Sequence, residues 1–345
     1  MGLFSSGDNK YLGIDIGDSS IKMVELTKKG KAIYLTNYGF SETLGGFKLS
    51  GVDDAEMIAK VVNRVRSDIG ISATKVSVSL PSFAVFSSVI NLSNVNKKNI
   101  AEKVSEEARK VIPLPLEEMV LDWKVIPAKP EEATGNTKIF LTGSPKKLIK
   151  KYINIFNAAK LNLVSLETET FSLIRSLLGN DKSTVMIVDM GDNSTDICIV
   201  KESIPYLNRS INVSGHNISE AIMSKLGVSL EKAEQLKSDL TGTLNGQKEV
   251  PEIILSTAMP IVNEIKYMAD LFQTTSGERL EKIILSGGGS MTANFAVYLE
   301  NQLNIQTIIG NPWFRVVCPN ELKPVLSEVG PKLAIAIGLA MRSLE

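Results

Sequence analysis

Two segments far apart in the chain share one pattern: an apolar strand ending in Asp-x-Gly, a short polar turn and a second apolar strand. The first is "GIDIGDSSIKMVEL", from Gly13 to Leu26, and the second is "MIVDMGDNSTDICIV", from Met186 to Val200. Each predicts two strands joined as a hairpin. Because the pattern occurs twice, we expect an internally duplicated fold.

The length and composition of the chain limit the class of protein that can carry this duplication. With 345 residues the chain exceeds the usual size of one domain, so we expect two packed lobes or one lobe with insertions. Apolar residues make up 43% and charged residues 22%, and 38 basic residues balance 38 acidic ones. This balance provides no bulk attraction to nucleic acid or to an anionic membrane.

The cysteine, histidine and apolar content exclude further classes. Two cysteines, Cys198 and Cys318, cannot build a disulfide framework or a cysteine metal cluster, and the single His216 excludes a histidine-rich zinc site. We therefore expect a reducing compartment. No apolar stretch approaches the roughly 20 residues that span a bilayer, and "LAIAIGLAM" near the C-terminus is expected to be a buried helix.

The region between the two repeats divides into a core part and a compact unit. Apolar spacing predicts an amphipathic helix from Ala55 to Ile69, followed by the strand "KVSVSLP", which ends at Pro81. From residue 82 to about 160 the order is strand, helix, strand, strand, helix, which predicts an inserted subdomain. After the second repeat we expect a helical section, the strand "KIILSGGGS" and a final helix after Pro331.

The turn of each repeat carries the groups that a phosphate site needs. Glycine lets backbone N–H groups approach closely, and hydroxyls or an ammonium add donors. The turn residues concerned are Gly17, Ser19, Ser20 and Lys22 in the first repeat, and Gly191, Asn193, Ser194 and Thr195 in the second. Asp15 and Asp189 end the preceding strands and could hold magnesium through water. Either turn alone is more often a plain hairpin, whereas two of them, ordered with a third glycine motif, favour a phosphate site.

The third motif is "LSGGGSMTANF", from Leu285 to Phe295. Three glycines between a strand and a helix let the backbone lie flat against a nucleoside, where any side chain would collide. In "SLEKAEQLK", Glu234 and Lys237 lie three residues apart on one helix face. They could reach a ribose and adenine, or they could form an ion pair within a solvated helix. The spacing leaves both interpretations open.

In chain order, the three motifs resemble the phosphate 1, phosphate 2 and adenosine motifs of the actin, Hsp70 and sugar kinase superfamily. The matching strings are "GIDIGDSSIK", "DMGDNSTDI" and "LSGGGSMTANF". Within that superfamily the chain resembles the PilM family of type IV pilus assembly proteins, in the FtsA-like branch, through "YLGIDIGDSSIKMVEL" and "ARKVIPLPLEEMVLDWKV". The last string is the more specific one, because generic actin-like ATPases lack it.

The resemblance implies an α/β, actin-like fold. In this fold a ribonuclease H-like unit is duplicated to give an ATPase with two lobes, and an FtsA-type 1C subdomain is inserted. Residues 1–81 and 161–185 would form lobe I, and residues 82–160 would form the 1C (SHS2-like) subdomain. Residues 186–322 would form the nucleotide-binding lobe II, and residues 323–345 a helix that returns to lobe I.

The resemblance also implies the ligands, ATP and Mg²⁺, and a role for each site residue. Asp15 and Asp189 would flank the magnesium, and the two turns would grip the phosphates. Gly287, Gly288 and Gly289 would lie along the adenosine, with Glu234 and Lys237 clamping it. Glu169, in "SLETETF", falls where relatives orient the attacking water, although an acid at a helix N-terminus is equally explained by the helix dipole.

Two turn residues depart from the family pattern. Asp18 stands where PilM relatives commonly carry serine, and its carboxylate would repel a terminal phosphate unless magnesium or Lys22 compensates. Asp18 therefore bears on both the affinity for ATP and its hydrolysis. Asn193 replaces a glycine found in many members of the superfamily, which is a milder change because asparagine tolerates the left-handed backbone conformation.

The expected function is that of an ATP-binding assembly protein, cytoplasmic and peripheral to the inner membrane through a protein partner. PilM-like proteins bind the short cytoplasmic N-terminal tail of the membrane protein PilN, in a groove between the core lobe and the 1C subdomain. ATP would clamp the lobes and thereby alter this groove, with at most slow hydrolysis. The pilus assembly ATPases are a further expected class of partner, whereas nucleic acid and direct membrane insertion are not expected.

Two rival functions share the same fold. A small-molecule kinase needs a carboxylate base beside an acceptor hydroxyl, and Asp192 and Asp196 are available, although each is also explained as a turn residue. An FtsA-like filament former carries an amphipathic membrane helix after a linker, whereas the apolar residues of "PKLAIAIGLAMRSLE" surround the helix and suit burial in the core. Polymerisation itself stays open.

Overall fold

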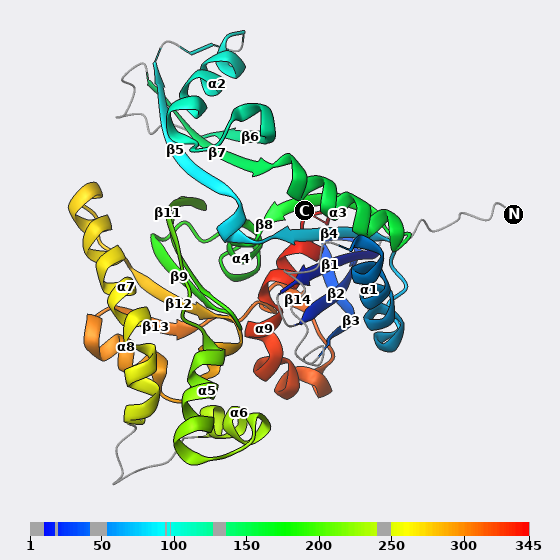
Figure 1. Cartoon of the computed structure of the whole chain (residues 1–345), viewed down its shortest axis with the longest axis vertical. Coiled ribbons are helices and arrows are strands. Elements are labelled where there is room, and N and C mark those ends of the chain that lie inside the picture. The colour runs from blue at the N-terminus through cyan, green and yellow to red at the C-terminus, as the bar shows by residue number, and fades with distance from the viewer. Residues whose placement is uncertain are drawn as a thin grey trace, which may run out of the picture.

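The computed structural model describes residues 10–17, 20–41, 54–93, 95–96, 98–126, 136–239 and 250–344. Within these ranges the strands form three sheets, of which two make the cores of two lobes and the third a separate small unit (Figure 1). Asp18 and Ser19 of the first predicted turn lie outside the described residues.

The sheet of lobe I is built around the first predicted hairpin. Its strands, in spatial order, are β14 (Val316–Val317), β3 (Ala32–Phe40), β2 (Ile21–Lys29), β1 (Lys10–Ile16), β4 (Lys75–Leu80) and β8 (Asn162–Thr168). β1, β2 and β3 run antiparallel, and β4 and β8 continue the sheet parallel to β1. Four consecutive residues are buried in each of β1 and β2. Both faces of the sheet are covered, which explains the continuous apolar runs.

Helices pack on both faces of this sheet. α1 (Ala55–Ile69) and α3 (Lys146–Ala158) share one apolar core with β1 and β4. The side chain of Asp54 caps α1 by accepting from two backbone N–H groups, and Gly70 ends it at a φ of +77°. α9 (Lys323–Met341) covers the opposite face so closely that a Cβ on Gly13 would lie 1.9 Å from the carbonyl oxygen of Ala336.

The sheet of lobe II is built around the second hairpin. In spatial order its strands are β11 (Ile204–Ile211), β10 (Thr195–Lys201), β9 (Val185–Met190), β12 (Lys282–Ser286) and β13 (Gln306–Ile309). Helices α5 (Gly215–Leu226), α6 (Leu230–Asp239), α7 (Glu252–Ser276) and α8 (Phe295–Leu303) contribute to the core on its outer face. α4 (Glu169–Leu177) and α9 pack on its inner face, between the two lobes (Figure 1).

The two lobes repeat one topology. In lobe I the spatial order is β3-β2-β1-β4-β8, so the strand that comes first in the chain, β1, lies between the second and the fourth. In lobe II the spatial order β11-β10-β9-β12-β13 places β9 in the same way. In both, the first three strands are antiparallel and the last two are parallel to the first. The expected duplication is confirmed.

The small third sheet belongs to the inserted unit. It consists of β5 (Phe86–Ser93), β7 (Asn136–Pro145) and β6 (Met119–Val125), with α2 (Ile100–Val111) packed on one face. A short 3₁₀ turn, Ser82–Ala84, connects it to β4. The final predicted helix of the unit, α3, packs instead with α1 in the core of lobe I. Its position favours ending the inserted unit near Pro145, and the domain boundaries remain a proposal.

The C-terminal helix begins earlier than the residue pattern predicted. α9 starts at Lys323, where the resemblance placed the C-terminal helix, and contains Pro331, so only the expectation from the residue pattern, a helix that begins after Pro331, was wrong. A proline inside a helix lacks one N–H donor, but tertiary contacts hold this turn: the carbonyl of Pro331 accepts from the backbone N of Gly287 at 3.0 Å. The expectation that no apolar stretch approaches the length of a membrane span was wrong, because Asn320–Met341 is long and apolar enough to cross a membrane; however, 67% of its apolar window is buried inside the protein. The predicted buried helix is therefore confirmed.

Candidate functional site

The two hairpins share one closing backbone hydrogen bond. The backbone N of Gly17 donates to the carbonyl of Ser20 at 3.0 Å, and the backbone N of Gly191 donates to that of Ser194 at 2.9 Å. In the first hairpin Asp15 lies opposite Lys22, and in the second Asp189 lies opposite Asp196. Asp189 interacts electrostatically with the three other groups, so the two turns lie close to each other across the lobes.

Asp15 and Lys22 form an ion pair in the half of the site that lobe I contributes. Lys22 Nζ lies 3.0 Å from Asp15 Oδ2, and the hydroxyl of Ser79 in β4 donates to Asp15 Oδ1 at 2.8 Å. Burial lowers the pKa of Lys22, but the Asp15 carboxylate and the charges of Asp189 and Glu169 outweigh it, so the pKa is raised. Lys22 therefore stays charged and is held beside the end of β1.

The other half of the site is acidic. Burial, reinforced by the Asp196 charge, raises the pKa of Asp189 to about 7, although Lys22 and Ser286 oppose the rise. Burial also raises the pKa of Asp196, whose Oδ1 is buried without a hydrogen-bond partner among the described residues. Excess negative charge and an unpaired oxygen are features that a bound cation would neutralise.

The donor set fits magnesium held through water. Among the described residues no three His, Cys, Asp or Glu side chains stand close enough to hold a metal ion together. Magnesium keeps several of its waters and needs only one or two carboxylates. Asp15 and Asp189 therefore fit the predicted role, and Asp196, which the sequence explained only as a turn residue or a kinase base, is an additional acceptor. Its position opposite Asp189 in the hairpin was the signal for it.

Glu169 lies at the start of α4 and faces this cluster. Its Oε2 accepts from the backbone N of Ser82 at 2.9 Å and from the Ser82 hydroxyl at 2.7 Å. Burial raises the pKa of Glu169 to about 8, the charges of Asp196 and Asp15 add to the rise, and the Ser82 bonds oppose it. The carboxyl group is therefore mostly protonated at neutral pH.

The remaining turn residues differ in how accessible they are. Thr195 is fully buried and its hydroxyl donates to the carbonyl of Val213 at 2.6 Å, so it supports the turn from within lobe II. The Ser194 hydroxyl donates to Asp196 Oδ2 at 3.4 Å. Asn193 is exposed, and Ser20 is partly buried. Among the described turn residues, the side chains of Ser20, Ser194 and Lys22 are therefore partly accessible at this site.

The triglycine motif is pressed against the end of β9. Gly287 has a φ of +77°, and a Cβ on it would lie 2.4 Å from the carbonyl oxygen of Met190. A Cβ on Gly289 would lie 2.8 Å from the Met190 Cβ, whereas one on Gly288 would meet only the flexible side chain of Lys332, at 3.3 Å. Gly287 and Gly289 are thus needed for the packing of the protein itself, and Gly288 is the glycine whose role packing does not explain.

Glu234 and Lys237 form the ion pair that the spacing allowed. Lys237 Nζ lies 2.8 Å from Glu234 Oε2, and it also donates to the Gly215 carbonyl at 3.1 Å and the Ser219 hydroxyl at 2.9 Å. Lys237 is buried, whereas the Glu234 side chain is half-exposed. The backbone N of Ala293 donates to the Lys237 carbonyl at 3.2 Å, so α6 adjoins the triglycine motif. Contact with a nucleoside stays a prediction for both residues.

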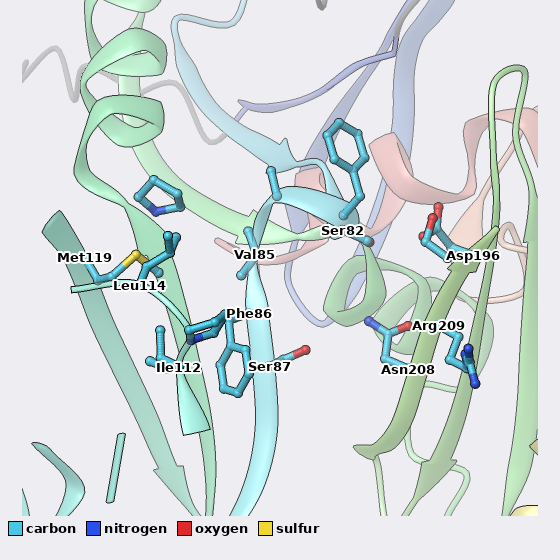
Figure 2. A pocket seen from close by; sticks show the side chains of 15 residues that line it. Ser82, Val85, Phe86, Ser87, Ile112, Leu114, Met119, Asp196, Asn208 and Arg209 are labelled. Carbon is cyan, nitrogen blue, oxygen red and sulfur yellow. The ribbon is translucent and has the colours of Figure 1, made fainter. Parts of the chain in front are cut away.

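A pocket of about 370 Å³ opens beside the acidic cluster, between the inserted unit and the β10–β11 hairpin (Figure 2). One wall is mainly apolar, with Phe86, Ile112 and Leu114 among its side chains. The facing wall is polar and includes Asp196 and Arg209. Ser82, the partner of Glu169, also lines the pocket. The resemblance implied a groove between the core lobe and the inserted subdomain, but it did not identify these lining residues, which come from segments far apart in the chain.

The duplicated sheets and their facing turns define an actin-like fold. A model of the family described as type IV pilus assembly protein PilM matches residues 13–344. The chain therefore belongs to this family. It is similar in structure to the solved PilM-PilN type IV pilus biogenesis complex, with a TM-score of 0.82, 24% identity, and coverage of 97% of this chain and 98% of that one.

Two more distant similarities support the same fold. MreB5 of Spiroplasma citri bound to ADP is 12% identical, with a TM-score of 0.52 and coverage of 96% of this chain and 95% of that one. The cell division protein FtsA of Bacillus subtilis (strain 168) is 24% identical over 256 residues, which are 67% of this chain and 58% of FtsA. The chain thus spans little more than half the length of that relative.

Proposed function

We propose that this chain is a cytoplasmic ATP-binding assembly protein of type IV pilus biogenesis, and that its nucleotide state controls its affinity for a partner peptide. The equivalence of the two turns carries the proposal. Asp15 is opposite Lys22 in one lobe, Asp189 is opposite Asp196 in the other, and their charges meet between the lobes. A solved protein of the same fold, MreB5, is bound to ADP.

Each lobe contributes to one half of the nucleotide site. The hydroxyls of Ser20 and Ser194 and the ammonium of Lys22 would donate to the phosphate oxygens. Gly17 and Gly191, whose N–H groups close their own turns, would let the backbone approach the phosphates. Asp15 and Asp189, supported by Asp196, would hold magnesium through water, and that ion would supply the positive charge that offsets the carboxylates and the phosphates. A ligand that contacts both turns favours the closed arrangement of the lobes by its differential affinity.

Hydrolysis is expected to be slow. A general base must be deprotonated and free to accept a proton. Glu169 has a pKa of about 8 and already accepts two hydrogen bonds on Oε2 from Ser82. In this arrangement Glu169 is better suited to anchoring Ser82 than to activating water.

The pocket beside Asp196 suits a short peptide, and we assign it to the N-terminal cytoplasmic tail of a PilN-like inner-membrane protein. The solved PilM relative forms a complex with PilN. Phe83 is 71% exposed and Leu114 48% exposed at the apolar wall, so both offer surface to apolar peptide side chains. Binding of this tail would keep the protein at the inner membrane.

Two residues connect the pocket to the nucleotide site. Ser82 lines the pocket and bonds to Glu169, and Asp196 lines the pocket and raises the pKa of both Glu169 and Asp189. A change of charge at the nucleotide site would therefore act directly on the pocket wall. Coupling between the two ligands follows, and it must be reciprocal.

The test is the binding of a fluorescent PilN-tail peptide, with and without Mg-ATP. We expect saturable binding that changes with nucleotide and that Phe83→Ala weakens by about tenfold or more, since burial of an aromatic ring contributes roughly 1.5–3 kcal/mol. Phe314→Ala is the matched control, because Phe314 is 53% exposed but does not line the pocket. No detectable binding with or without nucleotide would refute the assignment.

A further inference from the structure

The inserted unit has an open sheet edge, formed by β6 (Met119–Val125). Its strands lie in the order β5-β7-β6, so β7 pairs with one side of β6, and within the described part of the chain no strand pairs with the other side (Figure 1). An open strand edge presents a row of backbone groups with which another strand can pair. The proposed roles in binding ATP and a peptide use none of residues 120–126.

The ladder with β7 determines which backbone groups of β6 face the open edge. The backbone N of Ile126, the residue after β6, donates to the carbonyl of Lys138 in β7 at 2.9 Å, and the antiparallel register continues from there without a shift. Bonds to one neighbour involve every second residue of an antiparallel strand. The odd-numbered residues of β6 therefore point their N–H and C=O groups outward. In agreement, the N–H of Trp123 donates to Asp122 Oδ1, at 2.9 Å.

The side chains along this edge also have unused contacts. Val120, Trp123 and Val125 are exposed although they are large and apolar. Asp122 and Lys124 are exposed as well, and neither forms an ion pair with another described residue. The edge thus offers apolar surface and one charge of each sign.

The sequence of the edge is complementary to itself. In "VLDWKVI", residues 120–126, two apolar residues stand at each end, and an acid and a base flank a central tryptophan. If two copies pair antiparallel about Trp123, Asp122 of each copy lies opposite Lys124 of the other. Opposite charges across strands stabilise a pair, and like charges destabilise it. Pairing centred on Asp122 or on Lys124 would place like charges opposite each other, so one register is favoured.

We propose that the outer edge of β6 pairs with the same edge of a second copy of this chain, and that the two inserted units then share one continuous sheet. The Trp123 N–H would exchange the Asp122 carboxylate for the Trp123 carbonyl of the second copy. Asp122 would then be free to bind Lys124 of that copy. The contact is symmetric, and it is weak because one strand of each copy forms it. Charge complementarity and the central tryptophan make a second copy the occupant that this edge fits.

Sedimentation equilibrium of the full chain, over a series of concentrations and without nucleotide, tests the pairing. We expect a monomer–dimer equilibrium. Asp122→Lys and Lys124→Asp should each weaken it by about tenfold or more, since each places like charges opposite at both symmetric positions. An equimolar mixture of the two variants should restore the dimer, because opposite charges then face each other again. Glu106→Lys, at an exposed position of α2, makes the same charge change as Asp122→Lys and is the matched control.

Disulfide cross-linking tests the register. Trp123→Cys places two thiols directly opposite each other, at a separation that a disulfide can bridge. Val120→Cys places them six residues out of register, about 20 Å apart. We expect cross-linked dimers from Trp123→Cys only, above the background that the native Cys198 and Cys318 give in the wild type.

Four results would overturn the proposal. The wild type could stay monomeric at every concentration, neither charge variant could weaken the dimer, the mixture could associate no better than each variant alone, or both cysteine variants could cross-link equally. Each of these results would leave the proposed ATP and peptide sites intact, because residues 120–126 belong to neither.

Discussion

Ser82 donates two hydrogen bonds to one carboxylate oxygen of Glu169, at 2.9 Å from its backbone nitrogen and at 2.7 Å from its hydroxyl. Ser82 begins the short turn between β4 of lobe I and β5 of the inserted unit, whereas Glu169 begins α4, which packs between the lobes. The contact therefore links the turn that leads into the inserted unit to α4, which lies between the two lobes.

Removal of the Ser82 hydroxyl should uncouple the two proposed ligands. In Ser82→Ala the backbone N–H still binds Glu169, but the hydrogen bond from the hydroxyl to the mostly neutral carboxyl group, which contributes roughly 0.5–1.5 kcal/mol, is lost. We expect the ratio of the peptide Kd values with and without Mg-ATP to move toward one. Ser87→Ala is the control, because Ser87 lines the same pocket, whereas the serine that bonds to Glu169 is Ser82. An unchanged ratio in Ser82→Ala would exclude this route of coupling.

The stability of the ligand-free protein should fall as the pH rises. Glu169 and Asp189 lose their protons at their ordinary acidic pKa values in the unfolded chain, but at about 8 and about 7 in the folded chain. Between these values the folded state binds more protons, so the free energy of unfolding decreases with pH from about 5 to about 8.

Urea unfolding at a series of pH values, without magnesium or nucleotide, measures this slope. Glu169→Gln removes one of the two groups and should flatten the decrease, whereas Asp68→Asn, on the exposed side of α1, should leave it unchanged. A Glu169→Gln protein with the wild-type slope would show that Glu169 does not titrate as described.

The buried ion pair between Glu167 and Arg175 should be essential for stability. The two side chains are 4% and 15% exposed, and loss of one partner leaves a charge buried without compensation. We expect Glu167→Ala to lower the free energy of unfolding by ~3–5 kcal/mol. The exposed Arg64 and Asp68 pair provides the control, and Asp68→Ala should have little effect. Similar losses in both variants would contradict the special role of the buried pair.

Substitutions in the triglycine motif should separate packing from ligand binding. Gly287→Ala meets the Met190 carbonyl oxygen at 2.4 Å and requires a positive φ, so we expect a clear drop in Tm. Gly288→Ala meets only the side chain of Lys332 and should keep the wild-type Tm. If adenosine lies along Gly288, the same variant should still weaken ATP binding in titration calorimetry. Wild-type affinity in a well-folded Gly288→Ala protein would remove Gly288 from the predicted nucleoside contact.

The duplicated fold was predictable because its signal is local. Each hairpin has its apolar strands, aspartate and glycine within about fifteen residues, and the order of the motifs then predicts the lobes. Lys22 opposite Asp15 follows directly from the register of such a hairpin. The pairing of Asp196 with Asp189 follows from the register in the same way. The sequence does not reveal that the Oδ1 atom of Asp196 is buried without a hydrogen-bond partner among the described residues.

Other features depend on contacts between distant segments and could not be predicted. Pro331 sits inside α9 because Gly287 and the core of lobe I hold the helix around it. α3 belongs to the core of α1 through Tyr152, Ile155 and Phe156, although it follows the inserted unit directly in sequence. The bond between Ser82 and Glu169 likewise joins residues far apart in the chain, and so do the lining residues of the pocket beside Asp196, where the resemblance implied only that a groove exists.

The central claim is that two equivalent turns bind one magnesium-bound nucleotide, and calorimetric titration with ATP tests it most directly. We predict saturable binding that requires magnesium and that Asp15→Asn and Asp189→Asn each weaken by about tenfold or more, while Asp68→Asn binds as the wild type does. Failure of the wild type to bind Mg-ATP, or full affinity in both cluster variants, would contradict the claim. In that case the actin-like body would serve as a scaffold without a nucleotide.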